Sequence, residues 1–303
     1  MAISRSQLVK ELEPGLNALF GLEYDKYENE HAEIFNQESS DRAFEEEVML
    51  TGFGNAPVKQ EGAAVTFDSA NEAYTARYSH ETVALAFSIT EEAVEDNLYD
   101  RLSARYTRAL ARSMAHTKQI KAANVLNNAF TGGASAGGDG VSLVNTAHPT
   151  TGGGNFSNRN ATDADLNETS LEQAMIDISQ FIDERGLRIA VQARKLIVPP
   201  QLMFVADRIL NSTLRTGTAD NDINALVNMS MLPEGYRVNH YLTDTDAYFI
   251  MTDAPNGFKH FVRTPLATAM EGDFDTGNVR YKARERYSFG FSDPRCVYGS
   301  QGS

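Results

Sequence analysis

A serine in a glycine-rich stretch has the strongest catalytic pattern in this sequence. Gly133, Ser135 and Gly137 match G-x-S-x-G, the nucleophile pattern of many serine hydrolases. That pattern places the serine at a sharp turn between a strand and a helix, where its hydroxyl is exposed. Here the serine follows a predicted helix, and no strand precedes it. The sequence therefore favours a loop, and a soluble hydrolase that uses Ser135 is only a remote alternative.

Residue types that bind metals are present, but their spacing does not fit a metal site. Asp163, Asp165 and Asn167 begin like a calcium loop. Such a loop has glycine at its sixth position and glutamate at its twelfth, where this chain has Glu168 and Ala174. We predict turn or cap roles for these residues, and no metal or cofactor. The histidines are also scattered, with no pair four residues apart. They are His31, His80, His116, His148, His240 and His260.

The single cysteine, Cys296, excludes a disulfide within the chain and any site built from several cysteines. It lies between Pro294-Arg295 and Val297-Tyr298, and a small buried hydrophobic residue is the ordinary interpretation. No glycine loop ends in Gly-Lys-Ser/Thr, and no G-x-G-x-x-G follows a predicted strand. We therefore predict that the chain is not an enzyme.

The composition is that of a folded protein with a large core, arranged as one or two domains. The chain has 303 residues, 42% of them hydrophobic and 22% charged. No apolar run approaches the ~18 residues of a membrane span, and the N-terminus has no apolar signal core. The net charge of −14 argues against a nucleic-acid binder as a whole, because phosphate binding relies on clustered lysine and arginine. Any such contact would need a local basic face.

The longest predicted element is one helix from Ser88 to Phe130. Ser88 with Glu91 fits a capping box, Thr90 is a second candidate cap, and Gly132 supplies the stop. Acidic residues come first and basic residues later, which complements the helix dipole. A helix of this length spans roughly 60 Å. Its apolar face is formed by Val94, Leu98, Leu102, Tyr106, Leu110, Met114, Ile120, Val125 and Leu126.

Two unusual segments precede this helix. Residues 1–47 are strongly acidic and carry an apolar stripe at helical spacing, which Pro14 and Gly15 interrupt. They form either an arm with short helices that needs a partner surface or a solvated N-terminal helix of the same domain. Residues 48–88 contain two extended arms around a glycine-rich centre, and the second arm alternates at Val83, Leu85, Phe87 and Ile89. We predict a long hairpin-like loop that leads into the helix.

Helices and strands alternate irregularly in the rest of the chain, which indicates an α+β fold. Polar, glycine-rich loops follow the long helix. A second helix is predicted over 169–185, with Thr169 and Glu172 as its capping box. A buried strand over 196–198 precedes Pro200, which suits the first turn of a helix over 201–210. Strands are predicted over 236–241, 247–251 and 279–291.

The last of these strands has a basic face. Val279, Tyr281, Ala283, Tyr287, Phe289 and Phe291 point one way, and Arg280, Lys282, Arg284 and Arg286 point the other. The basic face could meet the acidic arm of a neighbouring copy or a polyanion. It could also pair with Glu91, Glu92 and Glu95 of the long helix, or be solvated.

The order of these parts resembles the major capsid proteins of tailed bacteriophages, which have the Hong Kong 97-type fold. Three local sequences resemble parts of that family. Residues 196–202 are similar to its strand-proline-helix, and residues 246–250 to its strand that begins with aspartate. Residues 284–295 are similar to the terminal strand of Mu-like head subunits. The resemblance implies an N-terminal arm (1–47), an extended loop (48–88), a spine helix with peripheral domain (89–160), an axial domain (161–264) and a return to the peripheral domain (265–303).

The resemblance also implies a function. Many copies would assemble into pentamers and hexamers of an icosahedral shell that encloses double-stranded DNA. Such a virion capsid would be built in the cytoplasm of a host bacterium, with scaffolding and portal proteins, in some cases a decoration protein, and no membrane. Scaffolding would be a separate protein or a removed piece, and Lys59 is a crosslink candidate by position. Contacts between copies are expected at Leu12, Leu16, Phe20, Tyr24, Phe53, Lys59, Phe67, Arg280, Lys282, Arg284 and Arg286.

An encapsulin-type nanocompartment shell is the main alternative, since it has the same fold but stores enzymes rather than a genome. The extended loop and the acidic arm favour a virus. A tail or baseplate protein would usually contain more β-structure than the long helix permits.

Overall fold

A computed structural model describes residues 5–90, 92, 99–133, 136–215, 222–273 and 277–303, with the side chains of 5–13 and 99–102 left aside. The chain forms two compact units, which are described in turn. The first unit contains residues 1–44, 79–122 and 260–289, and the second contains residues 45–78, 123–259 and 290–303. Among the described residues, no helix is long and apolar enough to span a membrane.

The first unit is built on a four-stranded sheet with the order β1-β10-β11-β4. These strands are β1 (Asn36–Ser39), β10 (Phe258–Gly272), β11 (Val279–Phe291) and β4 (Glu81–Ile89). Strand β11 is antiparallel to β4, with Val279 opposite Ile89 and Tyr287 opposite Glu81. The predicted strand 279–291 is therefore confirmed at both ends.

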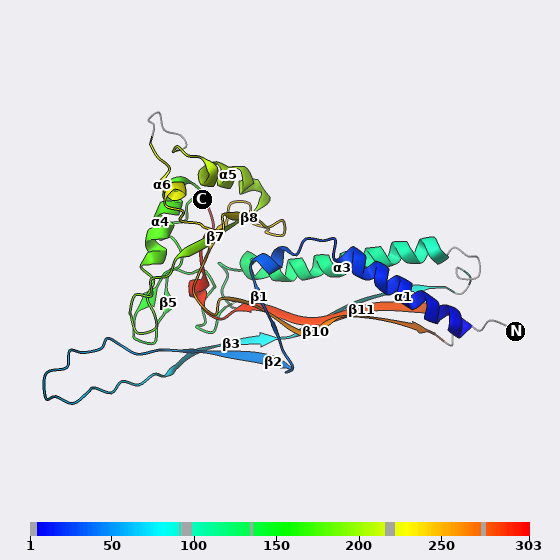
Figure 1. Ribbon diagram of the computed structural model, residues 1–303, viewed down its shortest axis with the longest axis horizontal. Coiled ribbons are helices and arrows are strands. Elements are labelled where there is room, and N and C mark those ends of the chain that lie inside the picture. The colour runs from blue at the N-terminus through cyan, green and yellow to red at the C-terminus, as the bar shows by residue number, and fades with distance from the viewer. Residues whose placement is uncertain (1–4, 91, 93–98, 134–135, 216–221, 274–276) are drawn as a thin grey trace. The chain divides into compact units, whose positions relative to one another are not determined.

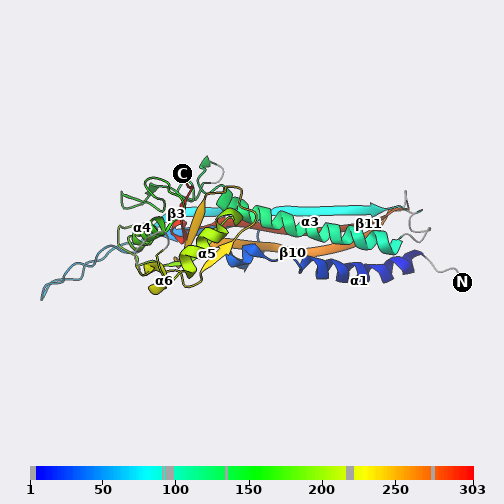
Figure 2. The ribbon, with the colours of Figure 1, turned by 90° about the horizontal axis from the view of Figure 1, so that it is seen from above.

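Two helices pack on one face of this sheet, which we call the inner face. Figures 1 and 2 show α1 (Arg5–Tyr24) and α3 (Tyr99–Asn127) running along β10 and β11. The core between them contains Leu16, Phe20, Leu110, Ala111, Met114, Tyr281 and Ala283. A short 3-10 helix, η1 (Glu30–Glu33), follows α1.

The long helix is shorter than the sequence predicts. Ser88 lies in β4, opposite Arg280 of β11, so the predicted start at Ser88 is wrong. The alternating apolar residues of the strand continue through Ile89, which is buried, and their burial outweighs the local capping signal. Glu91, the other half of the predicted capping box, lies outside the described residues. Helix α3 has 29 residues and spans roughly 44 Å.

The second unit contains a mixed sheet with the order β12-β9-β7-β8. Its strands are β12 (Val297–Ser300), β9 (Tyr248–Thr252), β7 (Ala193–Val198) and β8 (Tyr236–Val238). Strand β7 pairs antiparallel with β9 and parallel with β8. Leu196, Ile197 and Val198 are fully buried, which explains their uniform apolar character. The predicted buried strand is confirmed.

Helices cover this sheet in the second unit. They are α4 (Glu168–Ser179), η3 (Pro200–Leu202), α5 (Met203–Asn211) and α6 (Ala225–Asn228). Leu171 and Ile178 of α4 and Ile209 of α5 join a core with Tyr248 and Ile250 of the sheet. Pro200 stands at the start of its helical turn, as predicted.

The predicted capping box of α4 is wrong, because the helix starts two residues earlier than Thr169 implies. Asn167 is the N-cap, with an extended backbone, and its side chain accepts from Ser170 N at 2.8 Å. Ser170 Oγ accepts from Asn167 N at 3.0 Å in return. The helix ends at Ser179, and Ile182 then pairs with Arg188 around the turn at Gly186.

The hairpin-like loop is smaller than predicted. Strands β2 (Phe44–Leu50) and β3 (Glu72–Ser79) form a two-stranded sheet, and residues 52–70 between them contain no helix or strand. The predicted second arm divides at His80, because β4 pairs with β11 instead. The buried His80 ring lies between Ser40 Oγ at 2.9 Å and Ser288 Oγ at 3.0 Å. Two short strands, β5 (His148–Pro149) and β6 (Asn155–Phe156), and the turn η4 (Pro294–Cys296) complete the second unit.

Candidate assembly surfaces

The loop between β2 and β3 exposes large apolar side chains. Val58 is 96% exposed and Phe67 is 95% exposed, while Phe53 and Val65 are each more than 60% exposed. Lys59 is exposed beside Val58. Clustered apolar side chains at a surface usually mark a contact with another protein. The three loop residues predicted to contact neighbouring copies, Phe53, Lys59 and Phe67, are therefore all available.

Hydrogen bonds fix the base of this loop. Asp68 accepts from Gly54 N at 2.8 Å and pairs with Arg185 Nη2 at 3.0 Å. The backbone donors of Gly54 and Ser69, together with Arg185, hold the pKa of the Asp68 carboxyl below its usual range. Thr51 N donates to Asn71 O at 2.9 Å, which closes the base. The loop is thus tied at its base, while its apolar side chains face outward.

A buried arginine holds the C-terminal turn of the second unit. Arg295 is 3% exposed and donates to Glu184 Oε1 at 2.8 Å and to Ile182 O at 2.7 Å. Its guanidinium also pairs with Asp293 at 3.2 Å and lies 4.3 Å from the centre of the Phe156 ring. Burial raises the pKa of the Asp293 carboxyl, although Arg295 opposes that rise. No sequence pattern pointed to this residue.

A second buried network joins the glycine-rich loop to the C-terminal turn. His148 is fully buried, with Nδ1 2.6 Å from Asp139 Oδ2 and Nε2 3.1 Å from Asn158 Oδ1. Asn158 donates to the carbonyls of Leu143, Pro294 and Val297. An Asp-His pair also occurs in hydrolases, but the hydrogen bonds of His148 go only to these two residues within the described part of the chain. The geometry therefore fits a structural role. Ser135 lies outside the described residues.

Cys296 is buried against Gly257. Burial raises the pKa of its thiol well above the usual value. A methyl group on Gly257 would lie 2.4 Å from the Cys296 Cβ, so the two backbones approach closely at this point. The thiol fills a tight site, as the sequence predicts for a small buried residue.

The acidic segment after α1 is clamped inside the first unit. Gln119 of α3 accepts from His31 N at 3.1 Å and donates to Glu28 O at 3.1 Å. The His31 ring lies 5.4 Å from the His260 ring and 5.6 Å from the Phe289 ring. Burial, together with the nearby charge of Lys118, lowers the pKa of His31 to about 4 and that of His260 to about 3.

Glu285 is a buried charge that the alternation of β11 did not reveal. It is 2% exposed on the inner face, where Lys118 Nζ donates to it at 3.3 Å. Burial raises the pKa of the Glu285 carboxyl, and Lys118 opposes that rise. Lys118 also lies 5.3 Å from the centre of the Tyr287 ring. Glu285 lies between Ala283 and Tyr287 on the same face of the strand. This position alone does not predict a buried ion pair, because the partner, Lys118, comes from a distant part of the sequence.

The α1 residues predicted to contact neighbouring copies lie against their own chain. Leu16 is 6% exposed and Phe20 is 2% exposed, and both pack against α3 and β11. Tyr24 is half-buried and stacks on Phe20, with ring centres 6.1 Å apart. This matches the alternative of an N-terminal helix of the same domain, while a role in contacts between copies stays a prediction. The Leu12 side chain, also predicted to contact neighbouring copies, lies outside the part of the chain that the structure describes.

The basic face of β11 lies on the outer face of the sheet, opposite the helices. We call Arg280, Lys282, Arg284 and Arg286 the basic stripe. The first three are exposed and Arg286 is half-buried. Arg280 pairs with Asp273. Of the predicted helix partners, Glu92 is exposed, and Glu91 and Glu95 lie outside the described residues.

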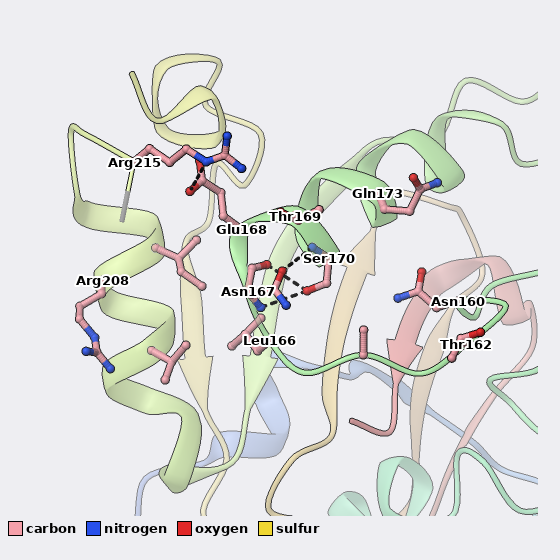
Figure 3. Close-up of a pocket in the computed structure, with 13 residues that line it drawn as sticks. Asn160, Thr162, Leu166, Asn167, Glu168, Thr169, Ser170, Gln173, Arg208 and Arg215 are labelled. Atoms are coloured by element: carbon pink, nitrogen blue, oxygen red, sulfur yellow. Dashed lines mark hydrogen bonds and ion pairs between the residues drawn. The ribbon is translucent and has the colours of Figure 1, made fainter. Parts of the chain in front are cut away.

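A polar groove of about 860 Å³ lies between α4 and α5. Figure 3 shows contacts among some of its polar groups: Asn167 and Ser170 form the cap of α4, and Glu168 pairs with Arg215 at 3.5 Å. Nearby, Asp163 pairs with Arg159. Asn167 therefore has the cap role predicted for it, whereas the contact of Asp163 with Arg159 is an ion pair.

The chain is similar to known proteins in both sequence and fold. A family described as phage capsid protein matches residues 73–300. The capsid of the Myoviridae phage XM1 has a TM-score of 0.53 at 12% identity, covering 89% of each chain. The capsid of an empty GTA particle has a TM-score of 0.56 at 13% identity, covering 90% of this chain and 89% of that one.

A virus-like particle from Pyrococcus furiosus is also similar, with a TM-score of 0.53 at 10% identity, covering 95% of this chain and 98% of that one. No curated protein matches the chain. The shared architecture confirms the predicted α+β fold of the Hong Kong 97 type.

Proposed function

Because the chain belongs to the phage capsid protein family, we propose that it is the major shell subunit of a virion and that its exposed loop joins neighbouring copies around double-stranded DNA. The observation that carries this proposal is the loop between β2 and β3. Val58 and Phe67 are almost fully exposed, yet the base of the loop is tied by Asp68 and Thr51. A fixed base with an apolar tip is suited to binding another copy.

Shell assembly of this kind uses heterologous contacts, in which different patches of two copies meet. Repeated around a symmetry axis, such contacts close into rings. The loop would be one of the two patches, and a different surface of the neighbouring copy would receive it. We infer that pentamers and hexamers form in this way, in the cytoplasm of a host bacterium.

The charge of the chain suits a shell around DNA. A net charge of −14 gives a wall without strong general affinity for phosphate, so DNA would move along it freely during packaging. Scaffolding and portal proteins are the partners that such packaging needs. The role proposed here is structural, and the buried Asp139–His148 pair has no part in it beyond stability.

The experiment is electron microscopy of the purified protein, with size-exclusion chromatography and with candidate scaffolding proteins added. Closed polyhedral shells, or rings of five and six copies, are the expected result. A monomer or dimer that persists with every scaffold would contradict the proposal. Nuclease-protected DNA within shells from infected or induced cells would support a virion. Shells filled with an enzyme would instead support an encapsulin-type compartment.

A further inference from the structure

The sheet of the first unit separates opposite charges. Helix α1 and the turn η1, which carry part of the acidic segment, lie on the inner face, since Phe20 is 6.5 Å from Tyr281 and His31 is 5.6 Å from Phe289, ring centre to ring centre. Tyr281 and Phe289 occupy odd positions of β11, whereas the basic stripe occupies even positions. Successive residues of a strand point to opposite faces. The acidic segment of one chain is therefore on the far side of its own basic stripe.

The basic stripe stands among small side chains. In β4, Ala86 lies opposite Lys282 and Ala84 lies opposite Arg284, and both alanines are exposed. On β10, the exposed alternate positions include Ala267 and Ala269. Pro265 and Glu271 are exposed at the same alternate positions of β10. On the β4 side, the long basic side chains of Lys282 and Arg284 therefore stand beside small ones.

Within the part of the chain that the structure describes, most of this charge has no ion pair. Among the described residues, Arg280 has an ion pair with Asp273, and Lys282 and Arg284 have none. The Nε atom of Arg286 is buried without a hydrogen-bond partner. Because alternate residues of a strand are ~6.6 Å apart, the stripe presents regularly spaced donors. An acidic segment could meet several of them together.

The complementary charge is present in the same chain. Residues 1–47 contain twelve acidic and four basic residues, which is more than half of the net charge of −14. Asp25 and Glu28 are exposed at the end of α1 and just beyond it. Because the end of α1 and the turn η1 lie on the inner face, the sheet separates Asp25 and Glu28 from the basic stripe of their own chain. A second copy of the chain brings them together without unfolding either one.

We propose that the basic stripe of one copy binds the acidic segment around Asp25 and Glu28 of the next copy. This inference rests on the proposed shell function and assigns a specific contact within it. The contact is heterologous, because opposite faces of one sheet meet in neighbouring copies, so it propagates around a ring. Complementary charge of this kind fixes orientation and register and speeds association more than it adds affinity.

The partner is a second copy rather than DNA. A polyanion that approached the stripe would also meet the acid excess of a chain with 41 acidic and 27 basic residues. The acidic segment, in contrast, is supplied once per stripe by every neighbouring copy. Each copy thus has one basic stripe and one acidic segment, and a closed ring requires equal numbers of the two contact surfaces.

The experiment is a charge swap within the full-length chain. Lys282→Glu with Arg284→Glu reverses the stripe, and Asp25→Lys with Glu28→Lys reverses the segment. We expect each pair alone to lower the fraction of protein in sedimenting shells by about tenfold, because like charges then face each other. All four substitutions together should restore assembly to within about twofold of the wild type. Arg105→Glu with Arg208→Glu changes the same charge at exposed sites elsewhere and should assemble normally.

The outcomes separate this contact from the function on which it rests. If the wild type forms no shells, the proposed function fails. If the wild type assembles and either reversed pair does too, the pairing is wrong. The pairing is also wrong if the fourfold variant does not assemble although its melting temperature equals that of the wild type. Normal shells of the stripe variant that have lost salt-sensitive binding to a duplex DNA probe would show that the stripe faces a polyanion instead.

Discussion

At the scale of single residues, the second unit depends on charges that water cannot reach. Arg295 joins Glu184, Asp293 and the carbonyl of Ile182 at a site that is almost fully buried. Taking these ions from water is costly, and only their mutual contacts offset that cost. Removing one partner therefore leaves a buried charge without compensation.

We predict that Arg295→Met destabilises the second unit by about 3–5 kcal/mol, because Glu184 and Asp293 then lose their buried cation. Urea unfolding of the unassembled chain measures this effect. Arg208→Met, an exposed arginine on α5, is the matched control and should change stability by less than about 0.5 kcal/mol. Equal effects of the two substitutions would mean that Arg295 is not a buried anchor.

Such a residue could not be predicted from the sequence. The partners of Arg295 include Glu184 and Ile182, more than 100 positions earlier, and only the folded chain brings them together. Cys296 next to it was predicted correctly, since a free cysteine is among the residue types that are most often buried. Phe53, Lys59 and Phe67 were located in an exposed loop because the glycines and proline around them exclude a central strand.

At the scale of elements, the clamp on the acidic segment depends on two neutral histidines. His31 comes from η1 and His260 from β10. Their neighbours are Lys118 and Gln119 of α3 and Glu285, Tyr287 and Phe289 of β11. The pKa values of His31 and His260, about 4 and about 3, lie below the ordinary value of 6.5. An open segment therefore binds more protons than the clamped one when the pH falls below 6.5, and acid favours opening.

We predict that the amides of residues 28–35 lose protection from hydrogen exchange between pH 6.5 and pH 4, after correction for intrinsic rates, before strand β7 does. His260→Phe keeps the stack on Phe289, whose ring centre is 4.2 Å away, and removes one titrating group. This variant should retain more protection at pH 4.5 than the wild type. His116→Asn, an exposed site on α3, should behave like the wild type. An identical pH profile for the wild type and His260→Phe would contradict the prediction.

Element boundaries were harder to predict than element types. Ser88 and Glu91 carry a good capping pattern, but the alternation that ends at Ile89 continues β4 through that site. Thr169 and Glu172 also match a capping box, although Asn167 has the extended backbone that an N-cap requires. A local motif shows that a helix starts nearby. Packing across the sheet then decides at which residue it starts.

At the scale of the whole molecule, the order of the parts made the fold predictable, because that order is shared by chains only 10–13% identical. The surfaces that bind neighbouring copies are harder to predict from the sequence than the fold is. Phe67 of the loop and Phe20 of α1 were both predicted to contact neighbouring copies. One is 95% exposed and the other 2%, and only three-dimensional packing separates them.

The exposed loop provides the final prediction. Val58→Asp with Phe67→Asp should abolish shell formation, because charges would replace the apolar side chains at the contact. The substituted side chains are almost fully exposed, so the stability of the unassembled chain should change by less than about 0.5 kcal/mol. Sedimentation measures assembly, and urea unfolding measures stability. Ile176→Asp on α4, where the apolar side chain is 50% exposed, is the control and should assemble. Full assembly of the loop variant would show that the contacts between copies lie elsewhere. The ion pairs between the basic stripe of one copy and the acidic segment of the next would then be the remaining candidate for the contact that closes the ring.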